Sequence, residues 1–186
     1  MIVREAEQRI AARLKPVADE DARMEAVFLL RASGFHSPYQ ALSEMDAKAL
    51  EPLIERRLAG EPLQYVLGEW EFFGLPFYVD RTVLIPRPET ECLVREACSA
   101  AESLRRMRIL AGQSGEPLKI LDLCTGSGCI AWTMALSLPG VQVTGVDISE
   151  EALSVARSQD FTRLLRKTGA RVPEFICRDV LDPDAS

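Results

Sequence analysis

Two glycines and an aspartate stand at the spacing of a nucleoside-binding site. Gly126 and Gly128 lie in the stretch KILDLCTGSGCIA, and Asp147 follows Gly128 by nineteen residues. Glycines let a backbone turn sharply and let a ligand approach it, and the first amides of a following helix have no partner within that helix. A carboxylate at the position of Asp147 can accept hydrogen bonds from both hydroxyls of a ribose. The pattern therefore predicts a cradle for a nucleoside.

An acid inside the same motif bears on which nucleoside binds. Gly126, Gly128 and Ala131 also satisfy the dinucleotide pattern G-x-G-x-x-G/A, which alone is a weak signal. Asp122 lies four residues before Gly126, where its carboxylate would face a positive group and repel a pyrophosphate. S-adenosylmethionine has a ribose, an ammonium group and no phosphate, so the acid favours it over NAD. The alternative without a ligand is a turn in an α/β core, with Asp147 as a helix cap.

The residues around the motif predict the order strand, turn, helix. Ile120, Leu121 and Leu123 form a short apolar run typical of a buried parallel strand, and residues 130–138 have the pattern of a helix. The turn between them comprises Cys124, Thr125, Gly126, Ser127 and Gly128. This unit would hold the glycines at the carboxyl end of a strand.

Two further strands are expected beside it. Residues 141–146 predict a second strand that leads into Asp147, followed by a helix capped by Ser149, and residues 174–177 predict a third. In a doubly wound sheet the ligand lies across the carboxyl ends of neighbouring strands. Asp179 and Val180 would then lie near an adenine, and Asp179 would either accept its amino group's hydrogen bond or only cap the strand turn.

The chain before the motif divides into a helical part and a hairpin. Residues 6–17 and 22–30 show helical spacing, a third short helix is expected to begin at Ser37, and Asp46 is expected to cap a fourth that stops at Gly60. Such a bundle is either a recognition module or a structural cap. Residues 69–79 predict a β-hairpin around Gly74. Arg87, between two prolines, is either a loop anchor paired with a carboxylate or a border of the ligand pocket.

Composition excludes several other classes of function. The 186 residues carry a net charge of -6, which argues against binding of a phosphate backbone, so the arginines at 105, 106 and 108 are interpreted as a solvated helix face. Five cysteines without a C-x-x-C pair indicate reduced thiols in the cytosol and no structural zinc. The sole histidine, His36, lies in a turn and is not expected to act as a catalytic base. No apolar run is long enough to cross a bilayer.

With these residues in place the sequence resembles the HemK/PrmC family, the protein-(glutamine-N5) methyltransferases that modify peptide chain release factors. Together with the helical amino terminus, the matching segments extend over essentially the whole chain: GEPLQYVLG, FFGLPFYV, LIPRPETE, ILDLCTGSGCIA and VTGVDIS. The resemblance implies an N-terminal helical bundle for substrate recognition at residues 1–66, a β-hairpin linker at 67–81, and the N-terminal part of a Rossmann-like class I methyltransferase domain at 82–186.

The resemblance also implies a site and a location. Cys124 to Gly128 would line the methionine and ribose of S-adenosylmethionine, Asp122 its amine, Asp147 the ribose hydroxyls, and Asp179 with Val180 the adenine. Cys124 stands where methyltransferase turns often have glycine, which is tolerable if its φ is negative. A release factor would be the partner, in the cytoplasm, without direct contact to nucleic acid or membrane.

One departure from the family limits the expected activity. The catalytic motif Asn-Pro-Pro-Tyr is missing, since the sequence contains no asparagine and no Pro-Pro pair. No catalytic residue is therefore assigned, and we expect a fragment of a longer protein with an incomplete sheet. The alternatives are an amino-methyltransferase acting on RNA or DNA, a non-catalytic nucleoside-binding module, and an NAD-dependent oxidoreductase.

Overall fold

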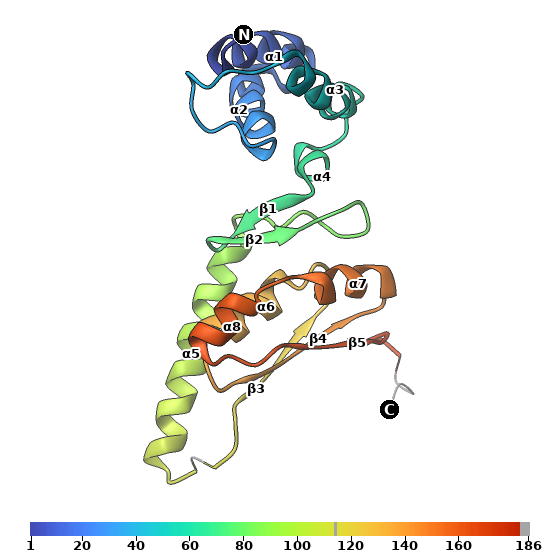
Figure 1. The fold of residues 1–186 in the computed structure, drawn as a ribbon. Helices are drawn as coiled ribbons and strands as arrows, with labels where there is room; N and C mark the ends of the chain where they lie inside the picture. The colour runs from blue at the N-terminus through green and yellow to red at the C-terminus, as the bar shows by residue number, and fades with distance from the viewer. Residues whose placement is uncertain (114, 183–186) are drawn as a thin grey trace. The chain divides into compact units, whose positions relative to one another are not determined.

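The computed structural model of the chain describes residues 1–113 and 115–182, in two compact units that divide between Gly68 and Glu69 (Figure 1). The first unit is helical. The second combines a hairpin, a parallel sheet and helices. The mixed α/β class with a helical N-terminal region is thus confirmed. Within the described residues, every helix is too short or too polar to pass through a bilayer.

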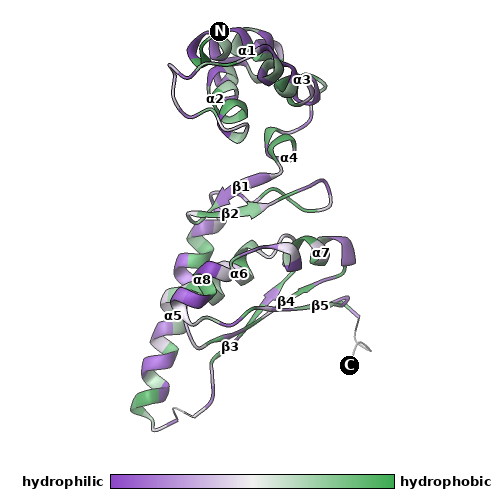
Figure 2. Cartoon of the chain, in the orientation of Figure 1, coloured by the Kyte–Doolittle hydropathy of each residue, from purple (hydrophilic) through white to green (hydrophobic). Residues whose placement is uncertain are grey.

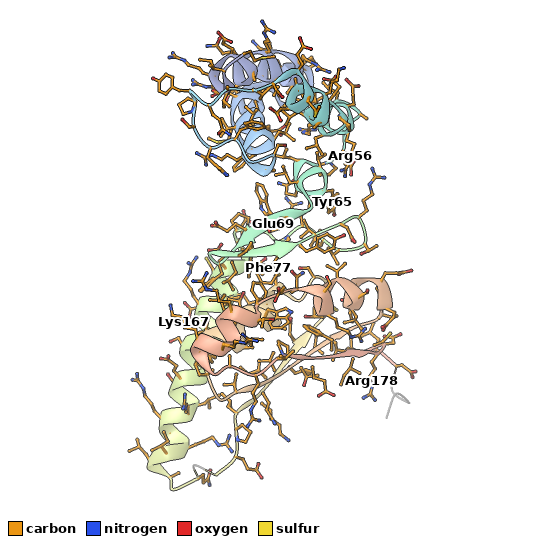
Figure 3. All side chains as sticks on the ribbon, in the orientation of Figure 1. Arg56, Tyr65, Glu69, Phe77, Lys167 and Arg178 are labelled. Carbon is orange, nitrogen blue, oxygen red and sulfur yellow. The ribbon has the colours of Figure 1, made fainter. Side chains whose placement is uncertain are left out.

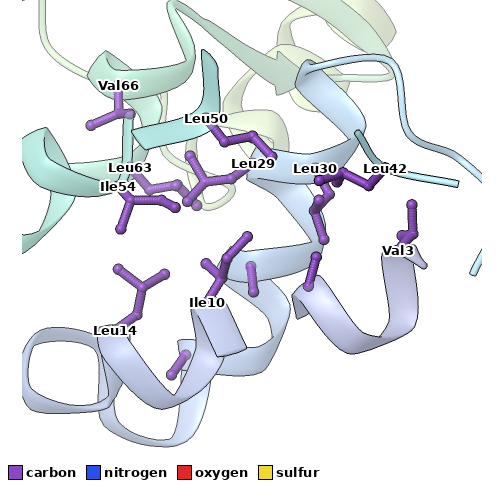
Figure 4. Packing of buried hydrophobic residues seen from close by; sticks show 13 residues of the cluster. Val3, Ile10, Leu14, Leu29, Leu30, Leu42, Leu50, Ile54, Leu63 and Val66 are labelled. Carbon is purple, nitrogen blue, oxygen red and sulfur yellow. The ribbon is translucent and has the colours of Figure 1, made fainter. Parts of the chain in front are cut away.

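The first unit is built from four α-helices and one 3-10 turn. They are α1 (Val3–Ala18), η1 (Asp19–Asp21), α2 (Ala22–Ala32), α3 (Glu44–Leu58) and α4 (Leu63–Leu67). Figure 4 shows apolar side chains from these helices meeting in one cluster, with Leu14 and Leu29 fully buried. The short α4, which periodicity did not predict, adds Leu63 and Val66 to the same cluster. The unit therefore has a core of its own.

The third helix expected at Ser37 is absent, and that prediction was wrong. The carbonyl of Pro38 accepts the N–H of Arg4 at 3.0 Å, so this segment is bonded to the start of α1 instead of to itself. The cap of α3 is Ser43 and not Asp46. The Asp46 N–H donates to Ser43 Oγ at 3.2 Å, and the Ser43 N–H donates back to Asp46 Oδ2 at 2.8 Å, which is a capping box.

The hairpin predicted at residues 69–79 is present as β1 (Glu69–Phe72) and β2 (Leu75–Tyr78), paired antiparallel. Its two-residue turn has positive φ at Phe73 and Gly74, 55° and 71°, as a type I′ turn requires. The hairpin falls within the second compact unit, which begins at Glu69. Phe77, labelled in Figure 3, is fully buried with its ring centroid 5.1 Å from that of Phe161.

Three parallel strands in the order β3-β4-β5 form the sheet of the second unit. They are β3 (Lys119–Leu123), β4 (Gln142–Asp147) and β5 (Glu174–Cys177), and the helices are α5 (Thr90–Leu110), α6 (Cys129–Ser137), α7 (Glu150–Ser158) and α8 (Thr162–Thr168). In Figure 1, α6, α7 and α8 lie on one side of the sheet. Figure 2 shows polar and apolar residues alternating along α5, which is amphipathic, whereas α6 is apolar.

The strand β3 is not buried on both faces as its apolar run predicted. Leu121 and Leu123 are 61% and 53% exposed, whereas Asp122 between them is buried. Successive side chains of a strand point to opposite faces. Since α6 and α7 pack on the face of Asp122, the leucines of the other face lie open in the described part of the chain.

Candidate nucleoside-binding site

The turn from Cys124 to Gly128 connects β3 to α6 at the carboxyl edge of the sheet. Its backbone is left-handed at three of five residues, with φ of 59° at Cys124, 54° at Gly126 and 75° at Gly128. The N–H of Thr125 donates to the carbonyl of Val146 at 3.0 Å and so fixes the turn to β4. The φ of Cys124 is positive, so the condition under which a residue other than glycine was expected to be tolerated here is not met. The side chain at 124 is carried in a conformation that costs L-residues free energy.

The two glycines of the turn serve different purposes. A Cβ on Gly128 would lie 3.0 Å from Ala156 Cβ and 3.1 Å from both Phe175 and Trp132, so any side chain there would push its neighbours aside. A Cβ on Gly126 would meet nothing within 4 Å. Gly128 is thus required by packing as well as by φ. Gly126 is required by φ alone and leaves the space beside it open to a ligand.

Asp122 is the buried acid of the site. Its Oδ2 accepts the Thr125 hydroxyl at 2.6 Å and the Ala131 N–H at 3.1 Å, so one oxygen fixes both the turn and the first residues of α6. Burial raises the pKa of the Asp122 carboxyl above its usual range, the charge of Asp147 adds to the rise, and the two hydrogen bonds oppose it. A cation beside this carboxyl would stabilise its ionised form.

Asp147 ends β4 and is half-buried beside the turn. Its Oδ2 accepts the Gly126 N–H at 2.8 Å, and its Oδ1 accepts the Ser149 N–H at 3.0 Å. Ser149 itself caps α7, because its Oγ accepts the Ala152 N–H at 3.1 Å. The helix cap is therefore Ser149, as predicted from the sequence. Asp147 instead connects the glycine-rich turn to the start of α7.

The segment after β5 reaches the same edge of the sheet. The N–H of Arg178, labelled in Figure 3, donates to the carbonyl of Asp147 at 2.8 Å. Asp179 and Val180 follow on the exposed surface, and Asp179 Oδ1 accepts the N–H of Leu181 at 2.9 Å. Asp179 thus holds its own turn through Oδ1.

Arg87 is exposed and belongs to the segment that leads into α5. Its carbonyl accepts the N–H of Thr90 at 3.0 Å. Among the described residues no carboxylate lies within ion-pair distance of its guanidinium. In the first turn of α5, Glu91 Oε1 accepts the N–H of Phe73 at 3.0 Å and so holds the hairpin turn, where Phe73 has a positive φ.

Two residues that matter to the site were missed by sequence reasoning. Gly145 in β4 makes room for Thr125, because a Cβ there would lie 2.8 Å from Thr125 Oγ1 and from the ring of Phe175. A lone glycine inside a strand signals such an approach, and that signal was available. Gln159 contacts the carbonyl of Ser127 from beyond α7. No local pattern signals this contact.

The thiols near the turn differ in their surroundings. Cys129 is buried at the start of α6, and burial raises the pKa of its thiol to about 11, so it remains protonated near neutral pH. Cys124 and Cys177 are exposed, and all five cysteines are free.

Taken together, the site offers two carboxylates and open backbone at one edge of a sheet, which suits binding of a polar ligand that carries positive charge.

Two family models match the chain. Residues 2–68 match the PrmC N-terminal domain, and residues 114–185 match a methyltransferase domain. The first match ends at Gly68, where the two compact units divide.

Several curated relatives of considerable identity share one name. Proteins named release factor glutamine methyltransferase match at 45% identity from Chlorobaculum tepidum, over 62% of this chain and 37% of the relative. Those from Flavobacterium psychrophilum and Geobacter sulfurreducens match at 36% and 39%, each over 84% of this chain and over 55% and 51% of their own lengths. The chain thus spans about a third to a half of the relatives that it matches. By these matches it belongs to the HemK/PrmC family, with a PrmC N-terminal domain followed by methyltransferase-domain sequence.

Proposed function

We propose that this chain forms the S-adenosylmethionine-binding part of a methyltransferase that modifies the side-chain amide nitrogen of a glutamine in a peptide chain release factor. The names of its relatives support the reaction and the substrate. A cytoplasmic location is part of the proposal, since release factors act at the ribosome.

The observation that carries the proposal is the hydrogen bonding of the Asp147 carboxylate. Each of its oxygens accepts one backbone amide, which fixes the carboxylate beside the turn. A carboxylate offers about four lone-pair sites, so two remain for the two hydroxyls of a ribose. The carboxylate is half-buried, which leaves it accessible from solvent.

The other site residues take roles that fit the same cofactor. Both hydrogen bonds to Asp122 end on Oδ2, and we assign Oδ1 to the ammonium of the methionine part. The open backbone from Cys124 to Gly128 would border the methionine and the ribose. Asp179 and Val180, exposed at the end of β5, would border the adenine. A buried acid at the turn disfavours a pyrophosphate and hence NAD.

The residues of this chain bind and orient and do not carry out proton transfer. When bound, S-adenosylmethionine supplies a methyl group on a positively charged sulfur. The amide nitrogen of glutamine is a poor nucleophile because its lone pair is delocalised, so orientation supplies most of the rate. The groups that would hold the glutamine amide are absent from this sequence, which has no asparagine. By itself the chain is expected to show negligible transfer and at best weak binding of the cofactor.

The first unit is proposed to recognise the protein substrate. Its helices close their own core, and a hollow of about 200 Å³ lies between α1 and α3 over Ile10, Leu50 and Ile54, with Arg9 and Arg13 at its border. Mixed apolar and charged surface of this kind suits a protein partner better than a phosphate backbone.

Calorimetry on the 186-residue chain tests the cofactor. S-adenosylhomocysteine should bind, and NAD should give no heat. Asp147→Asn should weaken binding of S-adenosylhomocysteine about 10-fold to 100-fold, because one charge-assisted hydrogen bond contributes about 1.5–3 kcal/mol. Glu174→Gln, an exposed carboxylate at the amino end of β5, is the matched control and should bind as the wild type does. Tighter binding of NAD would refute the assignment.

A second candidate, a nucleoside-binding module without catalysis, is favoured for this chain taken alone by the missing Asn-Pro-Pro-Tyr motif. Incubation with labelled S-adenosylmethionine and a release factor distinguishes the two. Methyl incorporation by the 186-residue chain would contradict the expected lack of activity. A steep salt dependence of binding to RNA would instead favour the nucleic acid methyltransferases.

A further inference from the structure

Gln159 directly follows α7 and is buried although its side chain is a polar amide, with 7% of its surface exposed. Its Oε1 accepts the N–H of Tyr78 at 2.9 Å, and its Nε2 donates to the carbonyl of Tyr78 at 3.0 Å. The side chain thus pairs with the main chain of β2 in the way that a neighbouring strand would. Both main-chain groups of Tyr78 therefore point away from β1.

The same amide also reaches the glycine-rich turn. Gln159 Nε2 donates its second hydrogen to the carbonyl of Ser127 at 3.3 Å. Ser127 is buried, with 2% of its surface exposed, and lies between the two glycines of the turn. One side chain therefore contacts the hairpin and the turn at the same time.

The turn needs such a restraint because of its composition. Glycine has more backbone freedom to lose than any other residue, and fixing one residue costs roughly 1–2 kcal/mol of conformational entropy. Asp147 holds the amide of Gly126 on one side of Ser127. Gln159 holds the carbonyl of Ser127 itself. These two side chains fix the backbone between the glycines in the conformation that borders the ligand.

Apolar contacts fix the surroundings of Gln159. The ring of Phe161, two residues further on, lies with its centroid 5.1 Å from that of Phe77 and 5.3 Å from that of Trp132. Phe77 precedes Tyr78 in β2, and Trp132 belongs to α6. The hairpin, the end of α7 and the helix after the turn are therefore packed together where the amide bridges them.

We propose that Gln159 is a positioning residue for the cofactor turn and that it couples the hairpin β1–β2 to the affinity of the turn for S-adenosylmethionine. The proposal rests on the function assigned above to the turn. It predicts that any change in β2 that displaces Tyr78 also displaces the backbone of Ser127, through Gln159. By linkage, a ligand that fixes the turn also fixes the hairpin.

Two variants and a control test the role in the 186-residue chain. Gln159→Leu keeps the size of the side chain and removes all three hydrogen bonds. Gln159→Glu keeps the acceptor for the Tyr78 N–H but loses both donors. Each variant should raise amide hydrogen exchange at Thr125 and Gly128 about tenfold and weaken binding of S-adenosylhomocysteine about tenfold, as loss of buried hydrogen bonds implies.

Ser158→Ala is the matched control. It changes the neighbouring residue, whose hydroxyl donates its hydrogen bond to the carbonyl of Val155 at 2.8 Å and not to the turn or to β2. Exchange at the turn and binding should stay at the wild-type level. Exchange of amides at the amino ends of β3 and β4 should be unchanged in all variants, because a general loss of stability would raise it everywhere.

A measurement on the wild type needs no variant. Saturating S-adenosylhomocysteine should slow exchange of the Tyr78 amide, which is bonded to Gln159 and not to the turn. If the wild type binds S-adenosylhomocysteine and the Tyr78 amide is unaffected, or if Gln159→Leu leaves turn exchange and affinity unchanged, the coupling is refuted. If the wild type does not bind at all, the proposed function fails, and turn exchange in the variants alone decides the role of Gln159.

Discussion

At the scale of single residues, the turn from Cys124 to Gly128 shows two reasons for a glycine: a positive φ and close packing by neighbouring side chains. Gly126 and Gly128 both have positive φ, yet only Gly128 is enclosed by side chains. Cys124 has the same backbone conformation without being a glycine. The sequence indicates where the turn lies, but it does not distinguish a glycine that faces a ligand from one that faces the core.

A pair of substitutions separates these demands. Gly126→Ala should lower the free energy of unfolding by about 1–2 kcal/mol, the cost of a side chain in the left-handed region. Gly128→Ala adds contacts of 3.0 and 3.1 Å with its neighbours, and overpacking costs a further 1–3 kcal/mol or so. Urea unfolding followed by circular dichroism measures both losses. Equal losses would mean that the core around residue 128 yields without cost.

At the scale of elements, short sequence patterns mainly predicted those structures whose hydrogen bonds join residues close in the chain. The hairpin and the cap of α7 at Ser149 are as predicted, because each depends on residues close in the chain. The strand at 174–177 is also as predicted, although its partner strand β4 lies about thirty residues earlier. The contacts that complete the site span greater distances. Gln159 and Tyr78 are 81 residues apart, and the exposure of Leu121 depends on which face α6 and α7 cover. A pattern read from a short stretch of sequence cannot predict contacts between residues this far apart.

The start of α3 shows why one local signal was misplaced. Serine begins helices at many positions, and Ser37 and Ser43 both precede helix-compatible residues. Only Ser43 has an acid three residues later that completes a capping box, since Asp46 donates its N–H and accepts that of Ser43. That hydrogen bonding lowers the pKa of the Asp46 carboxyl, with the Ser43 hydroxyl as the largest cause. The separate helix expected at Ser37 is absent, and Asp46, the expected cap of α3, is instead the capping-box partner of the actual cap, Ser43.

Ser43→Ala should accordingly destabilise the chain by about 1 kcal/mol, the usual loss on removing a serine N-cap. Ser37→Ala is its natural control, because Ser37 is exposed and caps no helix. Its effect should stay within about 0.5 kcal/mol. Both are measured as shifts of the urea midpoint. A larger loss at Ser37 than at Ser43 would show that the segment before α3 is held by that side chain.

At the scale of the whole molecule, the chain contains two separate hydrophobic clusters that share no residue in the described part. One is formed within residues 3–67 and the other within residues 72–175. The hairpin contributes Phe72 and Phe77 to the second cluster. The division between recognition and cofactor binding that we propose thus coincides with a division of the core, and the first unit has a complete cluster of its own.

Residues 1–68 expressed alone should therefore give a helical circular dichroism spectrum and one cooperative unfolding transition. By the usual stability per residue, about 0.05–0.15 kcal/mol, the unit should unfold with about 3–10 kcal/mol. Residues 1–60 are the matched control, because they lack the buried side chains of Leu63 and Val66 in α4. Burial of two such side chains contributes about 3–6 kcal/mol, so the shorter piece should lose most or all of its cooperative transition. If residues 1–68 show no transition while the 186-residue chain unfolds cooperatively, the first unit depends on the second, and the two clusters are not independent cores.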